Sequence, residues 1–176
     1  MMFDDDELSE KPGNQPHTKR IGREIAMQYL FRCELRNELP DATTFDLFFD
    51  QIKEEHGLKD NRTGRKAREY AEKLYLAVAL NAEAIDAVIR QRIAIADWEL
   101  ERISHVDRNI MRVALAEMLY MEDIPPVVSI NEAVEIARDY SGEDSGSFVN
   151  GVLNGVKDTL KRDPRSGKSV KKGESK

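Results

Sequence analysis

The first residues that could do chemistry are three cations, Lys19, Arg20 and Arg23, near the start of a predicted helix over residues 19–35. Their spacing of i, i+1 and i+4 places them on one side of the helix end, where they can form a compact patch. Cations at a helix N-terminus oppose the helix dipole at a cost of roughly 0.3–1 kcal/mol. The pattern favours an anionic partner such as a nucleic-acid backbone, although a solvated basic helix end would have the same pattern.

Two phenylalanines, Phe31 and Phe148, could supply an aromatic part of a nucleic-acid site. Unpaired bases stack on aromatic rings for about 1–3 kcal/mol each. Both residues also fit the apolar spacing of helices, so the pattern alone leaves core packing open as the alternative.

Residues typical of catalysis are few and scattered. The three histidines, His17, His56 and His105, form no recognisable motif with Cys33, which is the only cysteine. No zinc-protease, phosphate-loop or dinucleotide-binding motif occurs. The acidic residues between 97 and 107 lack the glycine and the spacing of a calcium loop. We therefore expect no enzyme activity, no metal and no cofactor.

The composition is typical of a helical protein outside the membrane. Of the 176 residues, 40% are hydrophobic, 34% charged and 7% aromatic, and no apolar run is long enough to cross a bilayer. The formal net charge of −6 hides a segregation, because residues 3–10 are acidic while residues 17–23 and 161–176 are basic. We expect a cytoplasmic protein whose basic segments meet phosphates.

Apolar residues recur at helical spacing along most of the chain, and no alternating strand pattern is present. Helices are predicted over residues 19–35, from a cap at Thr43 to residue 56, over 64–92 with a break at Asn81, and from a cap at Asp107 to Pro125. The fold class is therefore all-α, with about seven helices in one bundle-like domain over residues 18–162. Residues 1–17 are expected to be a disordered acidic tail, and residues 163–176 a flexible basic tail.

Residues 127–156 are predicted to form two capped helices joined by a short polar loop. Ser129 and Glu132 have the spacing of a capping box, which would start the first helix at Ser129. The helix ends near Gly142, and Asp144 or Ser145 is placed to cap the second helix.

Three stretches of the sequence resemble the NusB family of bacterial transcription antitermination factors. They are REIAMQYLF near the start, DRNIMRVALAEMLY in the middle, and IPPVVSINEAVEIARDYSGEDSGSFVNGVLNGV towards the end. The resemblance runs over roughly residues 19–160, and INEAVEIA followed by EDS and FVNGVL is its most specific part. It implies no catalysis and an all-helical fold of two small bundles, one of three and one of four helices.

The resemblance also implies a function and partners. A family member binds the single-stranded boxA element of nascent ribosomal RNA together with NusE, a ribosomal protein, and promotes processive elongation by RNA polymerase. The RNA-binding positions of the family fall here on Lys19, Arg20, Arg23, Phe31, Glu101, Asp144, Ser145 and Phe148. The positions that face the NusE partner fall on Asp107 and Phe31.

Two departures from the family pattern concern its cations. Ile21 and Gly22 interrupt what is commonly a denser arginine cluster, and Gly146 with Ser147 stands where some members carry His-Lys. Fewer cations displace fewer counterions, so we expect modest RNA affinity and a shallow salt dependence, for which the basic end of the chain could compensate.

Two other functions stay open at this point. One is a NusB-like scaffold that binds an acidic protein, and the other is the helical RNA-binding part of an RNA methyltransferase. A homodimer is also compatible with the pattern, because apolar spacing does not separate a core face from an exposed apolar face.

Overall fold

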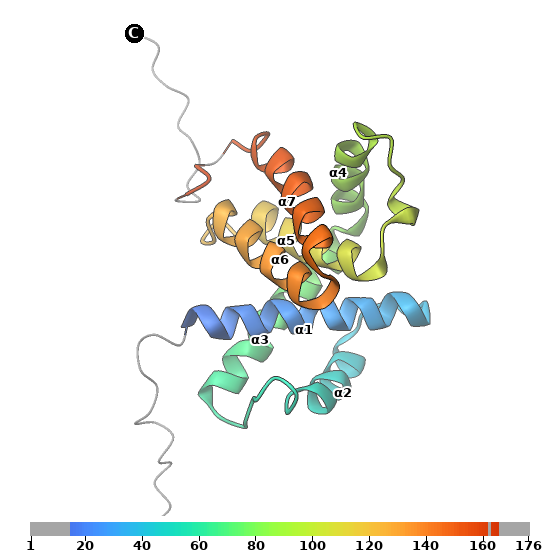
Figure 1. The fold of residues 1–176 in the computed structure, drawn as a ribbon. Coiled ribbons are helices and arrows are strands. Elements are labelled where there is room, and N and C mark those ends of the chain that lie inside the picture. The colour runs from blue at the N-terminus through green and yellow to red at the C-terminus, as the bar shows by residue number, and fades with distance from the viewer. Residues whose placement is uncertain (1–14, 162, 166–176) are drawn as a thin grey trace, which may run out of the picture. The chain divides into compact units, whose positions relative to one another are not determined.

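The computed structural model describes residues 15–161 and 163–165. Over these residues it contains seven α-helices, one short 3-10 helix and no strand, which confirms the all-α prediction. The elements are α1 (Gln15–Arg36), α2 (Ala42–Ile52), α3 (Arg62–Leu80), α4 (Ala82–Ala94), η2 (Leu100–Arg102), α5 (His105–Tyr120), α6 (Pro126–Ser141) and α7 (Glu143–Lys157), as Figure 1 shows. Most of both predicted tails lies outside the described residues, and α1 begins at Gln15, slightly before the expected start at Thr18. No described helix is both long and apolar enough to cross a membrane.

The chain divides into two compact units, Met1–Leu76 and Ala77–Lys176. The first unit contains α1, α2 and most of α3, and the second contains α4, η2, α5, α6 and α7. This is the three-helix and four-helix division that the family resemblance implied, whereas apolar spacing alone predicted one domain. Spacing marks which face of a helix is buried, but it does not show which helices share a core.

Aromatic side chains from three helices form the core of the first unit. The ring of Tyr29 on α1 lies 5.2 Å from that of Phe45 on α2 and 4.9 Å from that of Tyr75 on α3, between centroids. All three side chains are buried. Aromatic pairs of this kind contribute about 0.5–1.5 kcal/mol beyond the burial of their area. Figure 1 shows α2 and the first half of α3 on the same side of α1, so α1 supplies one face of this core.

The start of α2 differs from the prediction. Asp41 is the cap, because its carboxylate accepts a hydrogen bond from the backbone N–H of Thr44 at 2.9 Å. Thr43, which was predicted to cap this helix, lies inside the first turn. The aromatic core determines the difference, since the Tyr29 hydroxyl accepts from the backbone N–H of Asp41 at 2.9 Å and so fixes where the chain enters the helix.

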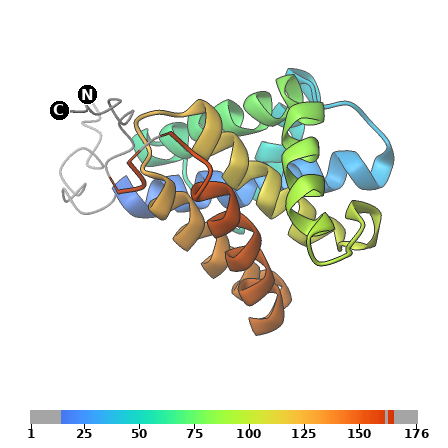
Figure 2. The same ribbon diagram turned by 90° about the horizontal axis from the view of Figure 1, so that it is seen from above.

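The second unit is built around α5. Met111, Leu115 and Met118 on this helix are fully buried, as its nearly all-round hydrophobicity predicted. The neighbouring helices α6 and α7 run side by side (Figures 1 and 2). A buried hydrogen bond ties α6 to α5, in which the Ser129 hydroxyl donates to Oε1 of Glu117 at 2.5 Å.

The predicted starts of α5 and α6 are wrong by a few residues. The cap of α5 is Ser104, whose hydroxyl accepts from the N–H of Asp107 at 3.1 Å, so Asp107 lies in the first turn. The helix α6 begins at Pro126, whose ring holds φ at a helical value, and Ser129 is therefore inside the helix. The hydroxyl of Ser129, which was predicted to cap α6, instead donates the hydrogen bond to Glu117 on α5.

The turn between α6 and α7 is a single glycine. Gly142 ends α6 and precedes α7, with a φ of 109° that a residue with a side chain rarely adopts. Neither Asp144 nor Ser145 caps α7, contrary to the prediction, because the helix already begins at Glu143. Both residues lie in the first turn, where a carboxylate is favoured by the helix dipole.

Candidate nucleic-acid interface

The three predicted RNA-binding cations of α1 have different environments. Lys19 and Arg20 are half-buried, while Arg23 is only 5% exposed. Nζ of Lys19 and the guanidinium of Arg23 each lie 5.6 Å from the ring centroid of Tyr70 on α3. Arg20 instead donates from Nε to Oε1 of Glu24 on its own helix at 3.2 Å. Two of the cations therefore contact α3, and the third is held on α1.

Arg20 belongs to a polar network inside the first unit. Its partner Glu24 also lies 3.5 Å from Nδ1 of His56, whose Nε2 lies 2.8 Å from Oε1 of Gln28. Burial raises the pKa of Glu24, but the hydrogen bond with His56 and the charge of Arg20 outweigh burial and hold that pKa below its usual value. The carboxylate is therefore charged at neutral pH and holds the guanidinium of Arg20 in place.

Gly22 allows α3 to approach α1 closely. A Cβ at this position would lie 2.9 Å from Cδ1 of Tyr70 and 3.2 Å from the backbone oxygen of Ala67. Distances this short are tighter than ordinary van der Waals contact, so a side chain at position 22 would push the two helices apart. Gly22, which interrupts the arginine cluster, thus allows Tyr70 to lie where Lys19 and Arg23 contact it.

Phe31, the predicted aromatic residue of α1, is half-buried. It follows Arg20 by about three helical turns, so the two residues share one face of α1 at about 16 Å along the axis.

In the second unit, a hydrogen bond joins two of the predicted residues. Oγ of Ser145 on α7 donates to Oδ2 of Asp107 on α5 at 3.0 Å. Asp107 is 8% exposed, and its Oδ1 is buried with no hydrogen-bond partner among the described residues. An unsatisfied buried carboxylate oxygen is costly, so this atom is a candidate acceptor for a donor from a bound molecule.

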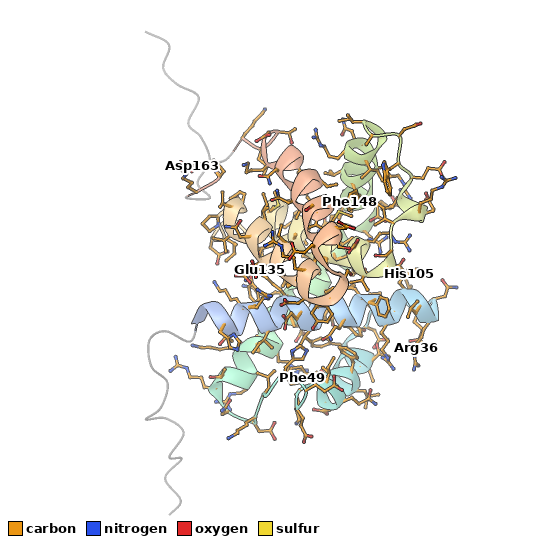
Figure 3. All side chains as sticks on the ribbon, viewed as in Figure 1. Arg36, Phe49, His105, Glu135, Phe148 and Asp163 are labelled. Carbon is orange, nitrogen blue, oxygen red and sulfur yellow. The ribbon has the colours of Figure 1, made fainter. Side chains whose placement is uncertain are left out.

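Phe148 forms a pocket with a residue that the sequence did not single out. Its ring lies 5.7 Å from that of Trp98, between centroids, at an interplanar angle of 35°. Both residues line a pocket of about 260 Å³ together with Arg92 on α4 and Gly151 on α7, which we call the aromatic pocket. Figure 3 shows Phe148 on the side of α7 that faces α4. Trp98 is 52% exposed, and the signal that could have found it is a lone tryptophan in a short polar connector.

Arg92 brings a cation to the aromatic pocket. Its guanidinium packs on α7 at Gly155, where any Cβ would collide with it. Its Nε is buried and has no hydrogen-bond partner within the described part of the chain. Two aromatic rings and a guanidinium around one hollow suit an unpaired base, because bases stack on both kinds of group.

Two further predicted residues, Glu101 and Asp144, are surface carboxylates. Glu101 on η2 is exposed and pairs with Arg90 on α4 at 3.3 Å. Hydrogen bonds from its own backbone N–H and from Arg90 lower the pKa of Glu101. Asp144 is exposed in the first turn of α7. Neither residue lines the aromatic pocket.

Gly146 accounts for the second departure from the family pattern. A Cβ there would lie 2.7 Å from Cγ of Arg138 on α6, so the small residue makes room for that side chain. Arg138 pairs with Glu143 at 3.2 Å and with Glu135 at 3.4 Å. Some family members carry a lysine at position 147, where this chain has a serine. Arg138 does not replace that cation, because Glu135 and Glu143 balance its charge.

The candidate residues are divided between the two units. The first unit holds Lys19, Arg20, Arg23 and Phe31, and the second holds Glu101, Asp107, Asp144, Ser145 and Phe148. Within the second unit the structure joins Asp107 to Ser145, and places Phe148 with Trp98. Among the described residues, no group of three or more histidine, cysteine or carboxylate side chains could hold a metal ion.

The three-helix and four-helix units, the α1 cations and the aromatic pocket define an all-helical protein with surfaces suited to single-stranded nucleic acid. The model of the NusB family matches residues 20–158, and the chain belongs to the NusB family.

Comparisons with individual proteins agree with the family match. The chain is 43% identical over 142 residues to transcription antitermination protein NusB of Bacillus mycoides (strain KBAB4), covering 81% of this chain and 98% of that protein. A crystal structure of antitermination factors NusB and NusE in complex with dsRNA matches with a TM-score of 0.66 and 28% identity, over 82% of this chain and 98% of the matched chain. NusB of T. maritima matches with a TM-score of 0.57 and 36% identity, over 78% and 89% of the two chains.

Proposed function

We propose that the chain is an antitermination factor that binds the boxA element of nascent ribosomal RNA together with NusE and promotes processive elongation by RNA polymerase. The observation that carries this proposal is the match to the complex of NusB, NusE and dsRNA, at a TM-score of 0.66 over 82% of the chain. The relative from Bacillus mycoides supports it, because this chain covers 98% of that antitermination protein.

Within this function, the two kinds of candidate site have different tasks. Lys19, Arg20 and Arg23 would hold backbone phosphates, which position the RNA without reading its sequence. The aromatic pocket would take an unpaired base that stacks on the exposed ring of Trp98, beside Phe148 and the guanidinium of Arg92. Base contacts carry the sequence information, so the preference for boxA would depend mainly on this pocket.

The NusE partner would contact Asp107 and Phe31. The buried Oδ1 of Asp107 supports its assignment, because it can accept a hydrogen bond that no described residue supplies. The half-buried ring of Phe31 offers apolar area on the face of α1 that also carries Arg20.

The role proposed for the protein is that of an adaptor without catalysis. NusE would dock beside the RNA to form a joint surface, and the RNA-bound pair would then be tethered to the elongating polymerase. Tethering raises effective concentration without any chemical step. The role needs no cofactor and belongs in the cytoplasm, where nascent RNA is made.

Sedimentation velocity on the full chain with NusE and labelled RNA tests this function. The RNA would be boxA, a scrambled strand of equal length, or a boxA duplex. We expect one species that contains both proteins with the boxA strand and no such species with the scrambled strand. A species that holds both proteins but excludes every RNA would contradict the proposal and favour a protein scaffold, and a complex only with the duplex would contradict the single-stranded assignment.

Matched substitutions on α1 test the cation assignment in the same experiment. Arg20→Ala removes a predicted RNA-binding cation, whereas Arg36→Ala removes an exposed arginine at the other end of the helix (Figure 3). We expect Arg20→Ala to lower the fraction of RNA in the complex and Arg36→Ala to leave it unchanged. Equal loss with both variants would show that total charge, not position, controls binding.

A further inference from the structure

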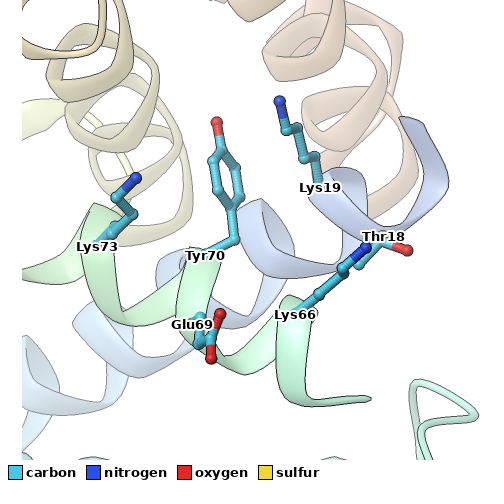
Figure 4. A pocket seen from close by; sticks show the side chains of 6 residues that line it. All are labelled: Thr18, Lys19, Lys66, Glu69, Tyr70 and Lys73. Atoms are coloured by element: carbon cyan, nitrogen blue, oxygen red, sulfur yellow. The ribbon is translucent and has the colours of Figure 1, made fainter. Parts of the chain in front are cut away.

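A basic pocket lies between α1 and α3 of the first unit. It has a volume of about 250 Å³, and we call it the lysine pocket. Its lining residues are Thr18, Lys19, Lys66, Glu69, Tyr70 and Lys73 (Figure 4). Only Lys19 was singled out by the sequence, because the other lysines are far along the chain and join it only through the packing of α3 against α1.

The position of Tyr70 creates this pocket. The missing side chain at Gly22 lets α3 approach α1, and Tyr70 then lies beside Lys19 at 5.6 Å from ring centroid to Nζ. Lys66 and Lys73 are placed one helical turn before and after Tyr70 on α3, so they lie on the same face of that helix. Lysines from two helices therefore line the same pocket as this tyrosine.

The pocket carries an excess of positive charge. Three lysines line it with a single carboxylate, that of Glu69, which Figure 4 shows directed away from the side to which Lys19, Tyr70 and Lys73 point. None of the three lysines has an ion pair with a described residue, whereas Lys53 in the same unit pairs with two carboxylates. Grouped like charges repel one another, and an anion bound among them removes that repulsion.

The ring of Tyr70 is already in contact with cations of this chain. Lys19 and Arg23 both lie 5.6 Å from its centroid, so the ring is poorly placed to stack on a base. A site whose tyrosine ring already lies beside cations of the chain is suited to phosphates, and phosphate contacts do not read the base sequence.

We propose that the lysine pocket binds backbone phosphates of the RNA and extends the RNA path from the start of α1 onto α3. The proposal rests on the proposed function, since it assumes that RNA is the ligand of this protein. It adds Lys66 and Lys73 to the binding surface, and it assigns them a contact that is independent of sequence.

The test is a salt titration of RNA binding by the full chain. The double variant K66A/K73A removes two lysines of the pocket, and the matched control K59A/R65A removes two exposed cations of the same unit that do not line it. Each phosphate contact contributes about 0.7 to the slope of log affinity against log salt for single strands, so K66A/K73A should reduce the slope by about 1.4. The reduction should be the same for boxA and scrambled RNA, and the control should keep the wild-type slope. Equal slopes for the two double variants would overturn the proposal.

Lysine acetylation of the unmodified full chain gives a second readout that no folding defect can disturb. With boxA RNA bound, Lys66 and Lys73 should become protected while Lys59 stays reactive. RNA that binds with a preference for boxA but leaves Lys66 and Lys73 reactive would overturn the lysine pocket and keep the proposed function, whereas no preference for boxA would contradict the function itself. Lys66 and Lys73 could also be protected from acetylation without RNA and become reactive when residues 1–14 are deleted. That result would identify the acidic start of the chain as the occupant of the lysine pocket, and it would also overturn the proposal.

Discussion

The rings of Trp98 and Phe148 lie 5.7 Å apart, centroid to centroid, at an interplanar angle of 35° on the second unit. Trp98 belongs to the connector after α4, and Phe148 to α7, so the contact joins two segments that are distant in sequence. Together with Arg92 they surround a hollow of about 260 Å³. This arrangement gives the predicted RNA residue Phe148 a partner on the surface and supports a role for both rings in base stacking.

Removing the tryptophan ring tests that role. Trp98→Ala should weaken boxA binding by roughly 5- to 150-fold, because stacking is worth about 1–3 kcal/mol per base. The measurement is fluorescence anisotropy of labelled RNA. Leu80→Ala is the matched control, since Leu80 is an apolar residue of the same unit that is 81% exposed and does not line the pocket. Unchanged affinity in Trp98→Ala would remove the aromatic pocket from the RNA site.

The tryptophan also reports on binding directly, because it is the only one in the chain. Stacking of a base on the indole should quench its fluorescence as boxA RNA is added to the unmodified protein. A signal that stays constant while anisotropy shows full binding would place the RNA elsewhere.

The network around Glu24 predicts a dependence of stability on pH. The pKa of Glu24 lies below its usual value of 4.5 in the folded protein, although burial opposes this shift, because His56 and Arg20 stabilise the carboxylate. A group with a lowered folded pKa contributes stability above its unfolded pKa, and this contribution is lost as the pH falls through the folded pKa. Urea unfolding from pH 6 down to pH 3 should therefore show a smaller acid loss in Glu24→Gln than in the wild type. Glu54→Gln, at an exposed position, should behave like the wild type, and parallel curves for all three proteins would argue against the network.

Two glycines inside helices allow a matched test of packing. Gly22→Ala should destabilise the protein by about 1–3 kcal/mol, because the new Cβ would lie 2.9 Å from Tyr70 and 3.2 Å from a backbone oxygen of Ala67. Gly151→Ala on α7 has no atom within 4 Å of the new Cβ, so it should stabilise by up to about 1 kcal/mol through helix propensity. Denaturant unfolding measures both changes. A Gly22→Ala protein as stable as Gly151→Ala would mean that α3 does not pack closely on α1.

The basic end of the chain yields a further prediction. Residues 166–176 contain four lysines and one glutamate, and their removal should lower RNA affinity and reduce the salt slope by up to about 2. The cut belongs after Arg165, because the Pro164 carbonyl accepts a hydrogen bond from the N–H of Val127 at the start of α6 at 3.0 Å. A full-length chain with the four lysines replaced by serine should bind as weakly as the shortened one. Wild-type binding by both would show that this end does not compensate for the sparse cations of α1.

Apolar spacing predicted the helices well because it depends on short-range periodicity, and α5 is the clearest example. Helix starts were harder to predict, since a side chain that can cap a helix can also make a tertiary contact. Ser129 illustrates this, because its hydroxyl donates to Glu117 on a neighbouring helix and α6 begins earlier, at Pro126. The cap of α5 shifted for a related reason, as Ser104 lies where the chain turns and Asp107 does not.

The candidate site was predictable as a set of residue types but not as a set of contacts. The cations Lys19 and Arg23 were identified by spacing, yet their contact with Tyr70 depends on the packing of α3 on α1 at Gly22. Trp98 was not predicted as a site residue, because a tryptophan in a short connecting segment is usually assigned to the core, and its 52% exposure is known only from the structure. Long-range contacts of this kind arise from tertiary packing and leave no local pattern.

In the proposed function, this protein and NusE bind boxA RNA on a joint surface. The most direct test is the dissociation constant of the boxA strand for the full chain, measured at one salt concentration with and without saturating NusE, with a scrambled strand as the reference. A joint surface predicts that NusE tightens boxA binding by at least about fivefold and leaves the scrambled strand nearly unchanged. Equal boxA dissociation constants with and without NusE would contradict the claim.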